Sequence, residues 1–124
     1  YNVLEQKPGT ALLEARESGM DIIIKEGLAN GRTLRHPRLA ELSERMGCGA
    51  DQLALGVVLA QPFRPRVLSG AVTTDQLSSN LGAVGVCEKL TTTDEGRRVL
   101  EEVMDGCRMD SEEYWKDRSA LRWN

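Results

Sequence analysis

Two short apolar runs, each ending at or just before a glycine, constrain the fold of this chain more than any other feature. Residues 21–27 read DIIIKEG and residues 66–70 read RVLSG. Each run is too short for a helix and rich in aliphatic residues, which is typical of a buried strand. Helical patterns precede, separate and follow the two runs, so the order predicts a parallel α/β architecture. Two strands alone cannot complete such a sheet.

The segments around these runs carry helical periodicity and helix-start signals. The helix that begins at the cap Thr73 is expected to bury Leu77, Leu81 and Val84. Trp115 and Trp123, near the end of the chain, are expected to cover apolar surface on other helices. We expect helices at residues 10–18 opened by Thr10, from Pro37 to Met46, over 51–61, from Thr73 to about residue 84, from a Thr92-x-x-Glu95 cap through Met104, and from about Asp110 through Arg118.

Composition and charge exclude some functions. The chain has 124 residues, of which 40% are hydrophobic and 28% charged, a balance typical of one soluble globular domain. A net charge of -3 and a pI near 5.2 show no basic excess, which argues against a nucleic-acid partner. The apolar runs are far shorter than a membrane span, so no membrane association is expected.

The three cysteines indicate a reducing compartment. Cys48, Cys87 and Cys107 are odd in number and lack the close spacing of a metal site. We therefore expect free thiols, no metal, and a location in the cytoplasm or the plastid stroma. The chain begins at Tyr1 without an initiator methionine, so we expect it to be part of a longer protein.

The turn after the second run suggests a ligand site. Ser69-Gly70-Ala71 stands before the Thr73 cap, and a helix N-terminus at the carboxyl end of a parallel strand can receive an anion. Gln76 and Asn80 are one helical turn apart and could hydrogen-bond a purine or a ribose. The alternative is a capped surface helix with ordinary exposed amides.

Four segments of the chain, in order, resemble the C-terminal half of the aldo/keto reductases. They are DIIIKEGLANGRTL, DQLALGVVLAQPF, VLSGAVTTDQLSSNL and YWKDRSALRWN. The resemblance implies an eight-stranded (β/α)8 TIM barrel in which residues 1–124 form the C-terminal part of a single domain: the last two strands, their helices and a helical tail. The N-terminal half of the same barrel would be required as a partner. The implied activity is NADP-dependent reduction of aldehydes and ketones, with a small carbonyl compound as substrate and NADP(H) as cofactor.

The resemblance also assigns cofactor residues. The motif after the last strand would hold the adenosine and 2'-phosphate of NADP, and the loop after the preceding strand would touch its nicotinamide and pyrophosphate. The residues implied are Ser69, Gly70, Ala71, Thr73, Gln76 and Asn80 in the first group and Lys25, Glu26 and Leu28 in the second.

The chain also departs from the family. Lys25 stands where many members have an aromatic side chain that stacks on the nicotinamide; it is either functional or paired with Glu26 or another acidic neighbour. No basic residue stands near Gln76 to hold a 2'-phosphate, which leaves NADP and NAD both open. The family's catalytic Asp, Tyr, Lys and His belong to the absent half, so no catalytic residue is assigned here, and His36 is expected to be solvated. The alternatives to a reductase are a non-catalytic nucleotide-binding or regulatory protein and a truncated, inactive product.

Overall fold

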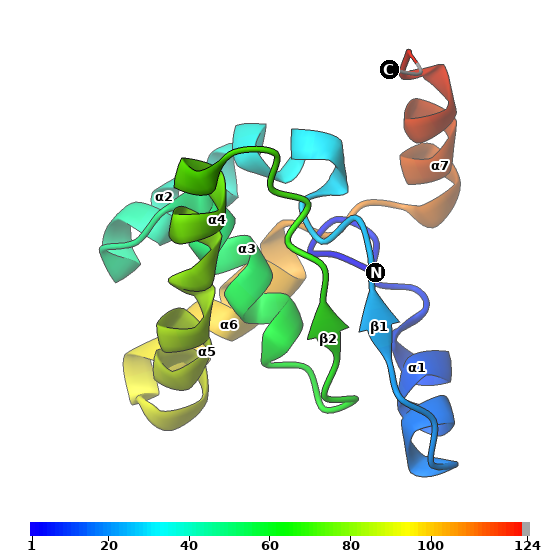
Figure 1. Cartoon of the computed structure of the whole chain (residues 1–124), viewed down its shortest axis with the longest axis horizontal. Coiled ribbons are helices and arrows are strands. Elements are labelled where there is room, and N and C mark those ends of the chain that lie inside the picture. Colours follow the sequence, from blue (N-terminus) through cyan, green and yellow to red (C-terminus); the bar gives the residue numbers. More distant parts are fainter. Residues whose placement is uncertain (123–124) are drawn as a thin grey trace.

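The two predicted runs pair as neighbouring parallel strands. The computed structural model describes residues 1–122 and contains strands β1 (Ile23–Ile24) and β2 (Arg66–Val67). Arg66 N donates to Ile22 O at 2.8 Å, and Leu68 N donates to Ile24 O at 2.9 Å. The strands run side by side in the same direction with helices around them (Figure 1). The chain therefore has a mixed α/β architecture with parallel strands.

Both strands are shorter than the sequence predicts. We expected strands over 21–27 and 66–70, but regular pairing covers two residues in each. The chain leaves extended geometry at Glu26 (φ 57°) and at Gly70 (φ 66°), where both backbones turn into loops. Each strand also has only one neighbour among residues 1–122, which limits the length of the ladder.

The strand pair has one covered and one open face. Ile22 and Ile24 are buried and pack with Val58 and Phe63. Ile23 lies between them on the opposite face and is 61% exposed. Because successive strand residues point to opposite faces, this alternation shows that apolar side chains occupy both faces. Such a pattern is typical of a parallel strand that is covered on both sides.

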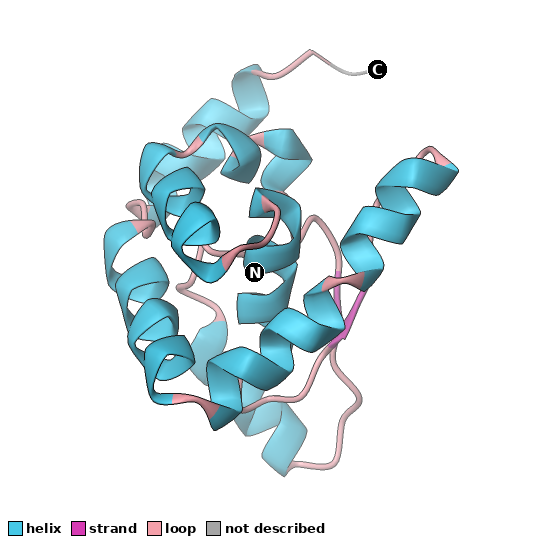
Figure 2. Cartoon of the chain, turned by 90° about the vertical axis from the view of Figure 1, so that its left-hand side faces the viewer, coloured by secondary structure: helices cyan, strands magenta, loops and turns pink. Residues whose placement is uncertain are grey.

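Helices make up most of the chain (Figure 2). The first helix begins at Gly9 after Pro8, one residue earlier than predicted, and Thr10 is not its cap. Two short 3₁₀ turns follow β1. The elements are α1 (Gly9–Glu17), η1 (Ala29–Gly31), η2 (Thr33–Arg35), α2 (Pro37–Met46), α3 (Ala50–Leu59), α4 (Thr74–Leu81), α5 (Ala83–Thr92), α6 (Asp94–Gly106) and α7 (Ser111–Ala120).

The main core lies around α3. Leu53, Ala54, Val57 and Val58 of this helix are all buried, in agreement with its nearly continuous apolar sequence. A side chain at Gly56 would come within 2.9 Å of Val86 Cγ1 in α5. The glycine therefore permits the close approach of α5 to α3.

This approach determines which face of α5 is buried. Ala83, Val86 and Leu90 face the core, spaced three and four residues apart. The predicted burial of Leu77, Leu81 and Val84 is wrong, because these side chains are between 45% and 65% exposed. The predicted single helix is also two helices, α4 and α5, which meet at Gly82.

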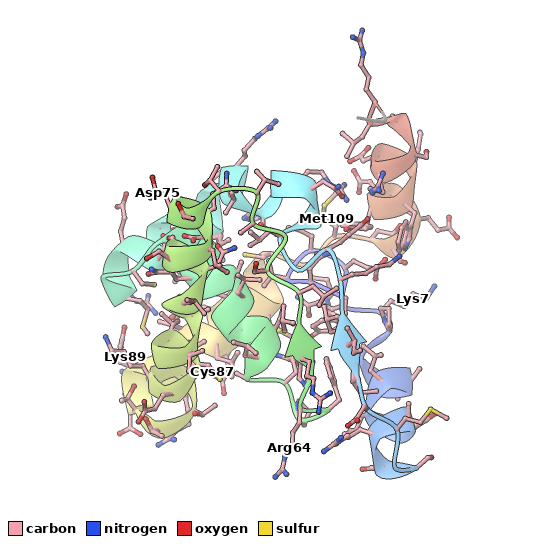
Figure 3. All side chains as sticks on the ribbon, in the orientation of Figure 1. Lys7, Arg64, Asp75, Cys87, Lys89 and Met109 are labelled. Carbon is pink, nitrogen blue, oxygen red and sulfur yellow. The ribbon has the colours of Figure 1, made fainter. Side chains whose placement is uncertain are left out.

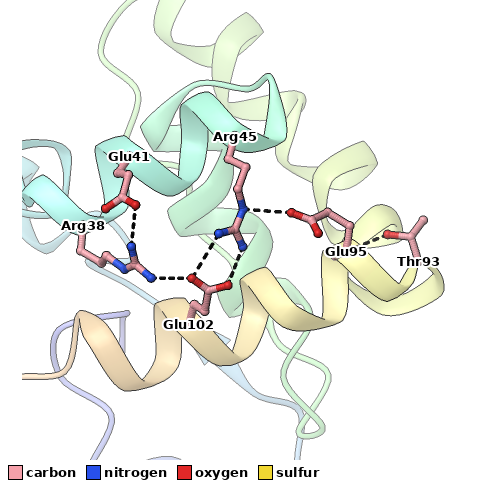
Figure 4. Close-up of polar contacts among 7 residues, drawn as sticks. Arg38, Glu41, Arg45, Thr93, Glu95 and Glu102 are labelled. Carbon is pink, nitrogen blue, oxygen red and sulfur yellow. Dashed lines mark hydrogen bonds and ion pairs between the residues drawn. The ribbon is translucent and has the colours of Figure 1, made fainter.

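An ion-pair network joins α2 to α6. Arg45 donates to Glu102 at 2.6 Å and contacts Glu95 at 2.9 Å, while Arg38 bridges Glu102 and Glu41 (Figure 4). The side chains of this network are between 33% and 64% exposed. Because exposed ion pairs are screened by water, the network contributes little to stability.

The cap of α6 lies one residue beyond the predicted one, Thr92. Thr93, and not Thr92, accepts a hydrogen bond from Gly96 N at 2.9 Å. Val99 and Val103 are buried, and Leu100 and Met104 pack against the same core.

Helix α7 buries a tyrosine and exposes a tryptophan. It begins after Asp110, whose carboxylate accepts hydrogen bonds from Glu112 N and Glu113 N, in agreement with the predicted start. Tyr114 is 1% exposed, whereas Trp115 is 53% exposed, so the expectation that Trp115 covers apolar surface is wrong for this chain. Trp123 lies outside the described residues.

Candidate functional site

A pocket opens where both strands end. Its volume is about 830 Å³, and it lies between the loop after β1, the loop after β2 and the first turns of α3 and α4. The arrows of β1 and β2 point toward this region in Figure 1. In parallel α/β folds, loops at the carboxyl ends of strands form the ligand site.

Most of the predicted site residues line this one pocket. Those that line it are Glu26 and Leu28 from the first loop, and Ser69, Gly70, Ala71, Gln76 and Asn80 from the second loop and α4. Lys25 and Thr73 do not line it. Lys25 is solvent-exposed at the end of β1, and Thr73 acts as a helix cap.

Gly70 determines the shape of the loop after β2. This residue has φ 66°, a conformation that favours glycine, and a side chain there would meet no atom within 4 Å. The positive φ, rather than close packing within the chain, is therefore what requires glycine. Ser69 Oγ accepts from Ala71 N at 3.2 Å, and Asn80 Nδ2 donates to Ser69 O at 3.2 Å. These two bonds tie the loop to α4.

The two amides of α4 take part in holding the loop. Thr73 Oγ1 accepts from Gln76 N at 3.1 Å, as the Thr73-x-x-Gln76 spacing predicts. The side-chain oxygen of Gln76 accepts from Val72 N at 2.9 Å, which uses one of its two lone pairs and leaves the NH2 group of this amide to donate to a ligand. Asn80 is buried and donates to Ser69, which leaves its side-chain oxygen as the group able to accept from a ligand.

The loop after β1 is held in a rarely populated backbone conformation. Glu26, Ala29 and Asn30 have φ values of 57°, 50° and 57°. Non-glycine residues at positive φ cost free energy, and they persist where surrounding contacts impose them. Thr33 Oγ1 donates to Leu28 O at 3.0 Å, and Ala29 is fully buried. This wall of the pocket is therefore formed by a loop whose conformation is held by contacts with neighbouring residues.

Glu26 is paired with the C-terminal helix and not with Lys25. Arg118 Nη2 lies 3.0 Å from Glu26 Oε1, and Arg118 Nε lies 3.4 Å from Oε2. Arg118 is thus the ion-pair partner of Glu26, while Lys25 acts on this carboxyl through its charge. The hydrogen bond from Arg118 holds the pKa of Glu26 below its usual range, against the opposing effect of burial.

The pocket is lined by carboxylates. Besides Glu26, Asp51 and Asp75 line it; Figure 3 labels Asp75 at the beginning of α4. Asp51 Oδ2 accepts from Ser79 Oγ at 2.6 Å. No lysine or arginine among residues 1–122 lines the pocket. A phosphate there would depend on the N–H groups at the start of α4 and on the Gln76 NH2 group.

Sequence reasoning missed several lining residues. Asp51 and Ala50 begin α3, and Ser79 lies on the inner side of α4. A helix start at residue 51 could be predicted, but its position opposite residue 79 depends on how α3 and α4 pack. Asn30 and Leu34 follow Leu28 in the first loop. Their place in that loop was the only sign in the sequence that they line the pocket.

The three cysteines and the histidine lie outside the pocket. Cys48, Cys87 and Cys107 are free thiols, as expected, and burial raises the pKa of Cys107 to about 11. No group of three possible metal ligands occurs among residues 1–122. His36 is half-buried rather than solvated as predicted, its Nδ1 atom has no hydrogen-bond partner, and burial lowers its pKa.

Comparison of the chain with models of known protein families finds no match. Within residues 1–122, no helix combines the length and the apolar character needed to cross a membrane.

Lowering the pH is expected to release Glu26 from Arg118. A carboxyl whose pKa is lower in the folded than in the unfolded protein adds stability above its unfolded pKa, and this stability is lost as the pH falls through the folded pKa. Arg118, Lys25 and Arg32 are the cations that favour the ionised form of Glu26. They hold its pKa below the ordinary glutamate value of 4.5. The contact should therefore be intact at neutral pH and lost only as the pH falls through the lowered pKa of Glu26, below its ordinary value of 4.5. An NMR titration of the Glu26 carboxyl measures this directly. A midpoint at or above the ordinary value would contradict the ion pair.

Proposed function

We propose that the protein is an NADP(H)-dependent oxidoreductase of the aldo/keto reductase type, which reduces aldehydes or ketones to alcohols. This chain would supply the part of the cofactor site that holds the adenosine and its phosphates. One observation carries the proposal: two separate loops, which the resemblance assigns to one cofactor, line one pocket at the carboxyl ends of two parallel strands.

The proposed roles follow from the groups that line the pocket. The N–H groups at the start of α4, apart from that of Gln76, which donates to the Thr73 cap, are suited to a phosphate, since a helix N-terminus has unpaired donors and the positive end of the dipole. The Asn80 side-chain oxygen and the Gln76 NH2 group can select the polar edges of adenosine. NADPH, when bound, would supply the hydride for carbonyl reduction. The proton donor would come from the N-terminal half of the barrel, because none of these 124 residues is assigned a catalytic role.

The open face of the strand pair supports the need for that other half. Ile23 and Leu68 are apolar and mostly exposed, and each strand has a free edge among the described residues. A barrel would add a further strand at each edge and cover this face. We propose a (β/α)8 barrel on this basis, with a small carbonyl compound as substrate and the cytoplasm or plastid as location.

Filling the pocket should abolish most of the cofactor affinity. Ala71 lines the pocket, and Ala71→Phe is expected to weaken NADPH binding about tenfold or more, because the ring would occupy space that the ligand needs. Titration calorimetry with NADPH measures the change. Ala11→Phe is the matched control, since Ala11 is exposed on α1 and does not line the pocket. Equal NADPH affinity in both variants would contradict the assignment.

A second candidate function is nucleotide binding without chemistry. It is favoured by Lys25, which stands where many aldo/keto reductases have an aromatic side chain that stacks on the nicotinamide. Turnover of a test aldehyde with NADPH by the whole protein distinguishes the two: the reductase oxidises NADPH, whereas the binding protein holds it unchanged. The truncated, inactive product is distinguished by the intact mass of the protein in its source cells, since 13.7 kDa would be the mass of these 124 residues alone.

A further inference from the structure

The C-terminal helix reaches the pocket loop through side chains spaced one turn apart. Tyr114 and Arg118 are four residues apart on α7, so they lie on the same face of the helix. Arg118 pairs with Glu26, which lines the pocket. Asn2 Nδ2 donates to Tyr114 Oη at 2.9 Å and lies 3.3 Å from Glu26 O. Asn2 therefore connects the buried tyrosine with the backbone of the loop.

Arg32, at the other end of the loop, makes a second set of contacts with α7. Its guanidinium lies 4.0 Å from the centre of the Tyr114 ring, and its Nη1 donates to Tyr114 O at 3.3 Å. A cation over an aromatic face is attracted by the ring's quadrupole. Residues 26 and 32 are thus both attached to one face of α7, and the backbone between them is the segment with positive φ values.

The pair between Arg118 and Glu26 is partly shielded from water. The two side chains are 21% and 30% exposed, which is less than for the other ion pairs of the chain as described. Two nitrogen atoms of the guanidinium face the two carboxylate oxygens. Such a fork-shaped arrangement fixes the orientation of both groups. The carboxylate of Glu26 therefore cannot turn freely in the pocket.

We propose that Arg118 is a positioning residue: its ion pair with Glu26 holds residues 26–32 against α7 and so holds one wall of the nucleotide pocket in place. We call this attachment of the loop to α7 the clasp. The tail helix then determines ligand affinity without touching the ligand. The identity of the ligand rests on the proposed function; the clasp itself rests only on the contacts described above.

Amide hydrogen exchange tests the clasp independently of any ligand. Ala29 N, Gly31 N and Arg32 N donate to carbonyls within the loop, so their exchange reports its opening. Arg118→Gln is expected to accelerate exchange of these amides about fivefold to tenfold. Lys116→Gln, which removes the same charge from an exposed position of the same helix, should leave it unchanged. The double exchange Glu26→Arg with Arg118→Glu should restore much of the protection.

Calorimetry then tests the effect on the pocket. Arg118→Gln is expected to weaken NADPH binding about threefold to tenfold, and Lys116→Gln to leave it unchanged. Unchanged loop exchange in Arg118→Gln would overturn the clasp. Faster exchange with unchanged NADPH affinity would overturn its role in the pocket. If the unaltered protein binds no NADPH but the exchange results hold, the proposed function fails and the clasp stands.

Discussion

Gly96→Ala is expected to destabilise the folded protein by about 3 kcal/mol or more, although alanine is the better helix former. A side-chain carbon at this position of α6 would lie 2.0 Å from Lys89 O and 2.8 Å from Leu90 Cα in α5. Both contacts are with backbone atoms, which cannot rotate away. The helices would have to separate, and Leu90 and Val99 would lose part of their burial.

The matched control is the same substitution in α5. Gly85→Ala adds a side chain with no atom within 4 Å at an exposed helical position, so it should stabilise the protein by roughly 0.5–1 kcal/mol. Urea unfolding of the two variants measures both free energies of unfolding. If Gly96→Ala stabilised the protein as Gly85→Ala does, the close contact of α5 and α6 would be wrong.

Tyr114→Ala is expected to cost about 3–5 kcal/mol in the free energy of unfolding, because it removes a buried ring. The same change removes the hydrogen bond from Asn2 and the contact of Arg32 with the ring. Tyr114→Phe separates the hydroxyl from the ring and should cost about 1 kcal/mol, since only the hydrogen bond is lost.

The neighbouring tryptophan provides the contrast. Trp115 packs edge-on against Tyr114 with ring centres 5.2 Å apart but remains more than half exposed. Trp115→Ala should therefore cost less than about 1 kcal/mol. Thermal or urea unfolding of the variants decides the matter. A larger loss at Trp115 than at Tyr114 would contradict the orientation of α7.

Local patterns were sufficient to find most of the elements. The helix from Pro37 to Met46 was predicted with its observed bounds, because proline at its start and Gly47 after its end mark both limits. The start of α4 was predicted equally well from Thr73 and Gln76, whose hydrogen bonds are made within a few residues. Caps depend on short-range geometry, which is why they can be read from the chain.

Burial was harder to predict, because it depends on the neighbouring elements. The apolar residues Leu77, Leu81 and Val84 have the spacing of a buried helix face, yet Ala83, Val86 and Leu90 are the ones that face the core. Gly56 of α3 accounts for the difference, since its missing side chain admits Val86. The same dependence explains why Tyr114, rather than the adjacent Trp115, is buried.

The candidate site likewise has features that local patterns predict and features that depend on how the helices pack. Local patterns predict that two short strands end in turns, that Gly70 and a capped helix follow the second strand, and that Glu26 and Leu28 follow the first. The packing of the helices brings these loops together around one pocket with Asp51 and lets Arg118 reach Glu26 from a separate helix. Turns and caps are fixed by interactions within a few residues, whereas a pocket and an ion pair between residues 92 positions apart exist only after the helices have packed.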